Sequence, residues 1–463
     1  MLELIQHARR VRLACFFAGI AELMLPFTGA CNRGLATTGA QVSVPSQWTQ
    51  PFLLKLPHRW DAWGRWAVNG VMGGSPTFGI FNARGLQAAP RVLPTLAGGT
   101  ISAVGQENPK SGASVSAPFS GVFAYVTNQL GASVSAYRID AGGNLVPLDT
   151  PSVPTGENPY ALAADPTGSY LYVTAGTDFK FGEVYIYAIN PQSGALTQVG
   201  PPTRVGSGAR SLKIAPWGTA LYVPCLNGKG IYAFSIDPGT GALKPLPGSP
   251  FPNLGQRPAA IAFSPSGALA FVANNASHSV TVFSVDPASG RLTPRGTGSA
   301  AGMAPIWAGT DASGAYLYIL SDGDDSIYGF SVARSGELAA LSPPASHGVA
   351  DPLSAALSPN GRFLYVPNWS SSGSFPANSV SVFSIDADTG ELSAIQGSPF
   401  ATGTGPASIA FEPTGRYAYV TNELAETIST FSVNPSTGAM TFLSQIRAGG
   451  RLPTTISIVS TNP

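Results

Sequence analysis

SIAFEPTGRYAYVTNELAETISTFSVNPSTGAMTFL, residues 408–443, is the clearest of seven related stretches in this chain. One aromatic position recurs at intervals of 47, 50, 49, 47, 47 and 54 residues. A nearly fixed period in this range is typical of a solenoid, a propeller or a repeat array. The recurring residues are Tyr125, Tyr172, Tyr222, Phe271, Tyr318, Tyr365 and Tyr419.

Each repeat contains four segments of β character. In one copy, residues 261–263 and 269–272 flank a Ser-Pro-Ser-Gly turn, and residues 279–285 are rich in β-branched and aromatic side chains. The fourth segment contains Pro294, and proline is tolerated on an edge strand but not in a central one. The middle segments are apolar on both faces and need neighbours above and below. Four-stranded sheets packed around an axis meet this need, so we predict an all-β, seven-bladed β-propeller.

The last repeat-like segment predicts how the ring closes. Residues 453–459 resemble an innermost strand, and we expect them to complete the blade that contains residues 123–126 and 134–137. This leaves residues 114–117 as a spare candidate for an inner strand. An alternative with eight blades uses that segment together with a decayed repeat over residues 64–82.

Composition excludes several classes of function. Only 11% of the residues are charged, while glycine (54) and proline (41) are abundant, which suits a chain of short strands and turns. A net charge of +1 provides no basic field for nucleic acid. Three cysteines in 463 residues form neither a disulfide framework nor a zinc motif, and we expect Cys225 to be a small buried residue. We predict no metal and no cofactor.

The N-terminal part has a different character from the repeats. Residues 1–31 resemble an export signal, with three arginines before an apolar run and Cys31 at a cleavage-like site, where a lipid anchor is an alternative to simple cleavage. Residues 32–112 are an extension, either poorly ordered or a decayed blade, and residues 113–463 are the propeller. We expect a periplasmic, secreted or lipid-anchored protein; without a working signal it would be cytoplasmic.

Ligand chemistry is expected where the loops entering the inner strands meet the loops joining the two middle strands, at one mouth of the ring. Arginine matches carboxylate or phosphate in a bidentate way, so converging arginines and acids predict a site for an anionic or sugar-like ligand. Each charge standing singly in water is the alternative. The candidate ligand-binding residues here are Arg210, Arg257, Arg451, Glu157 and Asp351, beside Glu423.

Other polar residues allow competing interpretations. The acidic loop over residues 322–325 either holds Ca²⁺ or is simply solvated, and the lack of a calcium-loop pattern favours solvation. Asn128, Asn274 and Asn422 follow the aromatic strands, and we expect turn residues that bond to local backbone. In the long loop over residues 368–376, Asn368 is a candidate for binding a ligand, and Trp369 and Phe375 are candidates for stacking on a sugar or a partner surface; the alternative is a loop folded back on its own blade.

The Tyr-Val-Thr-Asn strand, the Pro-x-Gly-Arg turn and the Pro-x-Thr-Gly-x-Leu turn resemble the YVTN-repeat, lactonase-like seven-bladed propellers. This family includes the propeller-type 6-phosphogluconolactonases. The resemblance covers residues 119–460 and implies a propeller fold. It also implies lactone hydrolysis, for which catalytic members carry an Arg-His pair after Gly-Pro and a following Asn-Glu-Leu.

This chain departs from the family's catalytic pattern. Asn422-Glu423-Leu424 is present, but Gly405-Pro406 is followed by Ala-Ser, so the Arg-His pair is missing. Lactone opening needs a base for water and cations for the developing oxyanion, and Glu423 is the candidate base. We therefore expect an exported propeller that binds a small ligand or a protein or carbohydrate surface. Hydrolysis of a sugar lactone by Glu423 is the alternative.

Overall fold

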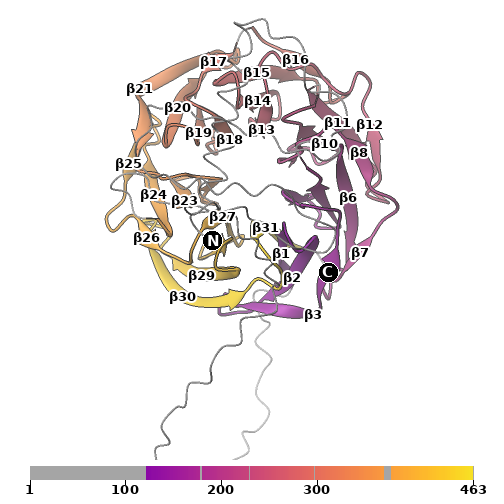
Figure 1. Cartoon of the computed structure of the whole chain (residues 1–463). Coiled ribbons are helices and arrows are strands. Elements are labelled where there is room, and N and C mark those ends of the chain that lie inside the picture. The colour runs from indigo at the N-terminus through magenta and orange to yellow at the C-terminus, as the bar shows by residue number, and fades with distance from the viewer. Residues whose placement is uncertain (1–120, 178–179, 229, 297, 370–376, 462–463) are drawn as a thin grey trace, which may run out of the picture. The chain divides into compact units, whose positions relative to one another are not determined.

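The computed structural model describes residues 121–177, 180–228, 230–296, 298–369 and 377–461. Within these ranges the regular secondary structure consists of β-strands, and these form seven sheets that follow one another around a ring (Figure 1). We call the sheets blades A to G in order around the ring. Strands that neighbour each other in a sheet are antiparallel throughout.

From the innermost strand outward, blade A contains β31 (Pro453–Ser460), β1 (Val122–Asn128), β2 (Ser133–Ile139) and β3 (Leu145–Pro154). Blade B contains β4 (Leu162–Ala164), β5 (Tyr170–Ala175), β6 (Gly182–Ile189), β7 (Leu196–Gln198) and β8 (Thr203–Val205). Blade C contains β9 (Lys213–Ile214), β10 (Ala220–Pro224), β11 (Ile231–Ile236) and β12 (Leu243–Pro245). Blade D contains β13 (Pro258–Phe263), β14 (Leu269–Asn274), β15 (Ser279–Val285), β16 (Leu292–Pro294) and β17 (Ser299–Ala300).

Blade E contains β18 (Pro305–Thr310), β19 (Tyr316–Ser321), β20 (Ser326–Val332) and β21 (Leu338–His347). Blade F contains β22 (Ala356–Leu357), β23 (Phe363–Asn368), β24 (Ser379–Ile385), β25 (Leu392–Ala394) and β26 (Phe400–Ala401). Blade G contains β27 (Pro406–Phe411), β28 (Tyr417–Asn422), β29 (Thr427–Val433) and β30 (Met440–Arg447).

Blades B, D and F have a fifth short strand because their outer edge is divided. In these blades two short pieces pair with the same third strand, as β16 and β17 both pair with β15. In blade A the single long strand β3 spans this edge with one register shift. The prediction of seven four-stranded blades is therefore confirmed. The segments that an eighth blade would use, 64–82 and 114–117, lie outside the described residues.

Ring closure by the C-terminal strand is also confirmed. Strand β31 pairs antiparallel with β1, with Tyr125 opposite Ser457 and Val122 opposite Ser460. Figure 1 shows the yellow end of the chain beside the indigo strand β1. The innermost strand of blade A therefore comes from the opposite end of the propeller sequence, and backbone hydrogen bonds close the ring.

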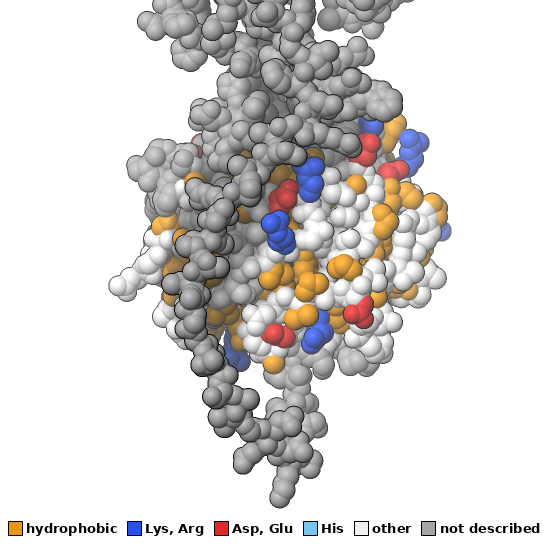
Figure 2. Space-filling model, turned by 60° about the horizontal axis from the view of Figure 1, so that its bottom comes forward, with side chains coloured by type: hydrophobic (Ala, Val, Ile, Leu, Met, Phe, Trp, Pro, Cys, Tyr) orange, Lys and Arg blue, Asp and Glu red, His pale blue; other side chains and the backbone are white. Residues whose placement is uncertain are grey.

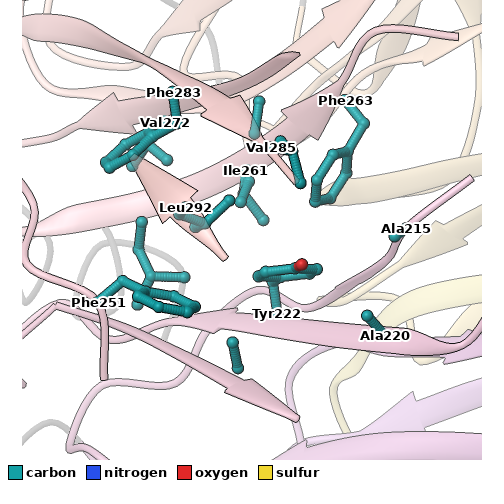
Figure 3. Packing of buried hydrophobic residues seen from close by; sticks show 13 residues of the cluster. Ala215, Ala220, Tyr222, Phe251, Ile261, Phe263, Val272, Phe283, Val285 and Leu292 are labelled. Carbon is teal, nitrogen blue, oxygen red and sulfur yellow. The ribbon is translucent and has the colours of Figure 1, made fainter. Parts of the chain in front are cut away.

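The core lies between blades and not within one sheet. Between blades C and D, Tyr222 and Ile231 pack against Ile261, Phe263 and other residues of the next blade, all of them buried. The rings of Tyr222 and Phe263 lie 5.1 Å apart between centroids at a 56° tilt (Figure 3). Burying both faces of each middle strand explains why apolar side chains occur on both faces of these strands.

The recurring tyrosine links each blade to the next one. Its buried hydroxyl donates to the carbonyl oxygen of the glycine in the next blade's outer turn, over 2.6–2.9 Å. Blade D has Phe271 at this position and lacks the hydroxyl. The six donor and acceptor pairs are Tyr125–Gly194, Tyr172–Gly241, Tyr222–Gly290, Tyr318–Gly390, Tyr365–Gly438 and Tyr419–Gly143.

The asparagines that follow the aromatic strands have a different role from the one predicted. Asn422 is the last residue of β28, is fully buried, and donates through Nδ2 to the hydroxyls of Thr427 and Ser429 on the neighbouring strand. Asn128 and Asn274 do the same in their own blades. The prediction of local backbone bonding was wrong, because the partners lie across the strand pair where a buried amide needs donors and acceptors.

We predict that Tyr222→Phe destabilises the ring by about 1–2 kcal/mol, because it leaves the buried Gly290 carbonyl without its donor. The midpoint of denaturant unfolding measures the effect. Tyr232→Phe, on the third strand of the same blade, is the matched control and should change the midpoint little, since it removes a hydroxyl from a less buried ring. Equal midpoints for both variants would contradict a stabilising role for the Tyr–Gly bond.

Candidate functional site

The loops entering the inner strands and the loops joining the two middle strands of each blade emerge on the same face of the ring, here called the loop face. Every non-glycine residue with a positive φ among the described residues lies in these loops. Such left-handed backbone is unfavourable for side-chain-bearing residues and clusters at functional sites. The ten residues are Ala132, Asn158, Arg257, His278, Ala304, Asp325, Asp351, Asn378, Glu426 and Leu452.

Several of these residues bond across the blade boundary. In each case the acceptor is a side chain in the loop before the third strand of one blade. The donor is a backbone N–H in the loop that enters the inner strand of the next blade. His278 Nδ1 accepts from Ala304 N at 3.0 Å, and Asn378 Oδ1 accepts from Gly405 N at 3.1 Å. Asp325 Oδ1 accepts from Asp351 N at 2.6 Å. The loop face therefore has fixed backbone positions around blades D to G.

Glu423 and Trp369 form a buried contact between blades F and G. The Trp369 indole Nε1 donates to Glu423 Oε2 at 2.9 Å, and the two residues are 2% and 3% exposed. The sequence places Trp369 on a polar loop as a stacking group, but the structure encloses it. A carboxylate held in this way is positioned by the indole and has little surface open to solvent.

Asn368 and Asp351 are held by bonds within the fold. Asn368 is fully buried, donates to Ser379 and Ser381, and accepts from Ala350 N at 2.9 Å. Its amide thus serves the same strand-to-strand role as Asn422. The backbone N–H of Asp351 donates to Asp325 Oδ1, and this bond positions Asp351.

Two of the candidate arginines have different contacts, Arg210 with Tyr160 and Arg451 with Glu426. The Arg210 guanidinium lies 5.5 Å from the ring centroid of Tyr160, and Arg451 Nε lies 3.5 Å from Glu426 Oε1. Arg257 takes a left-handed backbone conformation before Pro258. Figure 2 shows a face on which the few charged side chains lie scattered among uncharged surface.

A hollow of about 640 Å³ opens at the loop face of blade B. We call it the blade B hollow. Because it combines charged, hydroxyl and aromatic groups, it can bond to a polar ligand and also pack against its apolar face. Its lining residues are Gly156, Glu157, Gly176, Thr177, Lys180, Phe181, Glu183, Tyr185, Arg204 and Ser207.

The charged and aromatic side chains of the hollow are arranged in pairs. Lys180 Nζ lies 3.3 Å from Glu157 Oε2, and both side chains are largely exposed. The Arg204 guanidinium lies 4.8 Å from the centroid of Phe181, whose ring is 64% exposed. The hollow therefore contains hydrogen-bond donors, hydrogen-bond acceptors and an aromatic ring close together. Hydroxylated ligands bind to groups of these kinds.

The third pair lies on strand β6. The Tyr185 hydroxyl donates to Glu183 Oε2 at 3.0 Å, and burial, followed by this bond to a carboxylate, raises the pKa of Tyr185. A Cβ on Gly156 would come within 2.8 Å of the Tyr185 hydroxyl oxygen. The missing side chain at Gly156 is therefore what leaves room above this ring.

Of the predicted site residues, only Glu157 lies in the hollow, and sequence reasoning missed Glu183, Tyr185 and Arg204. A signal for two of them was present. Glu183 and Tyr185 occupy the register where blades A, D, F and G carry the hydroxyl residues that bond to asparagine, and Ala175 stands in place of the asparagine. Blades C and E also carry a tyrosine at the register of Tyr185, so the feature particular to blade B is Glu183.

The acidic loop of blade E is bonded within the protein. Asp324 Oδ2 accepts from Tyr328 Oη at 2.8 Å and from Met303 N at 3.2 Å. In the part of the chain that the structure describes, no three His, Cys, Asp or Glu side chains gather in a geometry that could hold a metal ion. Cys225 is fully buried, as predicted, and desolvation raises the pKa of its thiol to about 12.

The ring and its loop face define the class of protein as a seven-bladed β-propeller. The chain matches the family model described as Lactonase, 7-bladed beta-propeller, over residues 95–210, 206–308, 304–399 and 375–455. These matches cover more than half of the chain, and the protein therefore belongs to this family. Among the described residues, no helix is long and apolar enough to cross a membrane.

Individual relatives agree with this assignment. A 6-phosphogluconolactonase of Serratia proteamaculans is 30% identical over 166 residues, which are 32% of this chain and 44% of that protein. The chain thus spans less than half the length of this curated relative.

Solved structures at 20% identity or below resemble this fold. They include a putative 6-phosphogluconolactonase of Bacteroides fragilis (TM-score 0.63, 19% identity, covering 74% of this chain and 98% of that one). Another is a periplasmic gluconolactonase of Pseudomonas aeruginosa (TM-score 0.61, 20% identity, covering 74% and 100%).

The Trp369–Glu423 bond gives a prediction for stability. Trp369→Phe removes the indole N–H from a buried carboxylate, and we expect a loss of about 1–3 kcal/mol, read from denaturant unfolding. Glu423→Ala, which removes the acceptor, and the double variant complete a double-mutant cycle. The cycle should show a coupling energy of about 1 kcal/mol or more; additive effects would mean that this bond contributes nothing of its own.

Proposed function

We propose that this protein binds a sugar-like, hydroxylated ligand in the blade B hollow and does not depend on lactone hydrolysis. The observation that carries the proposal is the hollow itself, in which the Lys180–Glu157, Arg204–Phe181 and Tyr185–Glu183 pairs face a common space of about 640 Å³. Hydroxyl groups of a ligand can bond to both signs of charge, and the exposed Phe181 ring can pack against a pyranose face.

Family membership supports the class of ligand. The relatives with printed activities are lactonases of sugar acids. A propeller of this family that has lost part of the catalytic set can keep the recognition of polyhydroxylated molecules, because binding needs fewer groups than catalysis does.

The arrangement of Glu423 argues against hydrolysis. A general base must reach the water that it activates, and Glu423 is 3% exposed with Trp369 bonded to one carboxylate oxygen. The inner strand β27 begins Pro406-Ala407-Ser408, so no arginine or histidine stands where the family's catalytic pair would be. The groups needed to hold a developing oxyanion are therefore missing at that position.

Lactone hydrolysis is the second candidate function. It is favoured by family membership and by Asn422-Glu423-Leu424, which keeps one part of the catalytic pattern. In that case Glu423 is the base, and Trp369 has to move for water to reach the carboxylate. A direct assay of turnover separates the two functions.

We also propose that the protein acts outside the cytoplasm. Support comes from the sequence of residues 1–31, with its positive start, apolar run and Cys31 at a cleavage-like position. On this proposal the ligand is an external carbohydrate or a protein or carbohydrate surface, and the only membrane attachment is a lipid at Cys31. Cell fractionation of the full chain and of Cys31→Ser tests location and anchoring.

Tyr185→Phe tests the binding site. We expect about a tenfold loss of affinity for the uncharged monosaccharide that binds best in a calorimetric panel of glucose and related neutral sugars, since the variant removes a hydroxyl at the wall of the hollow. Gly156→Leu should abolish binding by filling the space above Tyr185.

Tyr232→Phe is again the matched control, because Tyr232 has the same register on the third strand of blade C, opposite Val223 as Tyr185 is opposite Val173. Its affinity should equal that of the unaltered protein. Binding that survives Gly156→Leu in a folded variant would place the ligand elsewhere, and the absence of any binding across the panel would contradict the proposed function.

A further inference from the structure

One register position on the innermost strands differs in a single blade. It is the position directly opposite the recurring aromatic residue, and six blades carry alanine, glycine or serine there, whereas blade C carries lysine. Small residues suit this position, since the inner strands converge on the axis. The residues are Ser457, Ala163, Lys213, Ala262, Gly309, Ala356 and Ala410 in blades A to G.

Lys213 is also the one charged residue on the seven innermost strands, β4, β9, β13, β18, β22, β27 and β31. Strand β9 pairs with β10 on one side only, so its other edge faces the axis, where propellers have a central channel. The side chain of Lys213 is solvent-exposed. Its ammonium makes no hydrogen bond or ion pair within the described part of the chain.

The surroundings of Lys213 disfavour its charge. The side chain is solvent-exposed, but the neighbouring strands partly desolvate its amine, and this desolvation lowers the pKa of Lys213. The other innermost strands offer no carboxylate at any position. A lysine in such a place gains most from an anion, which restores the interactions that the charge has lost.

The position of Lys213 separates it from the blade B hollow. Lys213 lies two residues before Ala215, where the turn to β10 begins, so it is near the end of the inner strand that points away from the loop face. The hollow is formed by loops at the opposite end of the strands. A ligand at Lys213 would therefore occupy a second site.

We propose that Lys213 is the anchor of an anion site on the axis of the ring, and that it binds the carboxylate or phosphate group of a small ligand. The small residues at the same level in five other blades leave room for such a group, whereas at Gly309 the side chain of Trp307 fills the space and provides an aromatic wall. This site does not depend on the function proposed for the hollow.

The first test measures binding of two probes, inorganic phosphate and gluconate, to the full chain by calorimetry in a chloride-based, phosphate-free buffer near pH 7. One or both should bind, and Lys213→Met should weaken that binding at least tenfold. Lys213→Arg should keep most of the affinity. Lys244→Met, on the exposed outer strand β12 of the same blade, should leave it unchanged. The pattern across the two probes distinguishes a phosphate ligand from a carboxylate ligand.

The second test uses the unaltered protein, so it does not depend on the variants folding. The neutral amine is the reactive form, and a lowered pKa makes more of it available, so acetic anhydride at pH 8.5 should acetylate Lys213 faster than Lys180 or Lys244. The bound anion should slow this reaction several-fold, and its affinity should fall as the pH rises through the pKa of Lys213.

Three results would overturn the proposal. These are no binding of either probe, equal affinities for Lys213→Met and the unaltered chain, and acetylation of Lys213 that neither anion slows. Tyr185→Phe distinguishes a failure of the Lys213 site from a failure of the blade B hollow. If it loses sugar binding but keeps anion binding, the two sites are independent, and each can fail without the other.

Discussion

The hydrogen bond from a buried tyrosine to the next blade's glycine carbonyl joins neighbouring blades at six of the seven boundaries of the ring. A fully buried phenol needs an acceptor, and the outer turn supplies one because its glycine has a φ between 68° and 80° that directs the carbonyl inward. The tyrosine strand and the Thr-Gly turn of the repeat are therefore two halves of one contact. Tyr419 reaches back 276 residues to Gly143, so the same bond that joins neighbours also closes the circle, beside the backbone pairing of β31 with β1.

Residues that obey the repeat are structural, and departures from the repeat mark the candidate sites. The asparagine and hydroxyl side chains at the loop face form hydrogen bonds with each other between neighbouring strands, as Asn422 does with Thr427 and Ser429. Blades B, C and E lack this network and carry a tyrosine at the same register, but only blade B places a glutamate, Glu183, beside that tyrosine on its third strand, and the hollow lies there. Blade C replaces a small residue on the axis with Lys213. Because the seven blades are similar, a structural role common to the repeat cannot explain a side chain that occurs in one blade only. Lys213 is such a side chain.

The fold could be predicted from the sequence because the features that determine it are local and recur in every repeat. Turn chemistry, strand propensity and proline at the edge are each visible within one copy, and seven copies reinforce the same conclusion. The site could be predicted only in part. Placing Arg210, Arg257 and Arg451 on loops of one face was possible, but their contacts depend on side-chain directions that sequence spacing does not determine. Trp369 looked exposed because its neighbours in sequence are polar, while its position is set by Glu423, 54 residues away.

We propose that this member of the lactonase family binds a ligand without hydrolysing it, since Trp369 encloses Glu423 and Ala407-Ser408 stand where the family's Arg-His pair would be. The most direct measurement is the rate of hydrolysis of a panel of sugar lactones, phosphorylated and unphosphorylated, by the purified full chain beside Glu423→Gln. We expect both proteins to leave the spontaneous rate of hydrolysis unchanged. Turnover by the unaltered chain that disappears in Glu423→Gln would contradict it and would make the protein a lactonase with a reduced catalytic set.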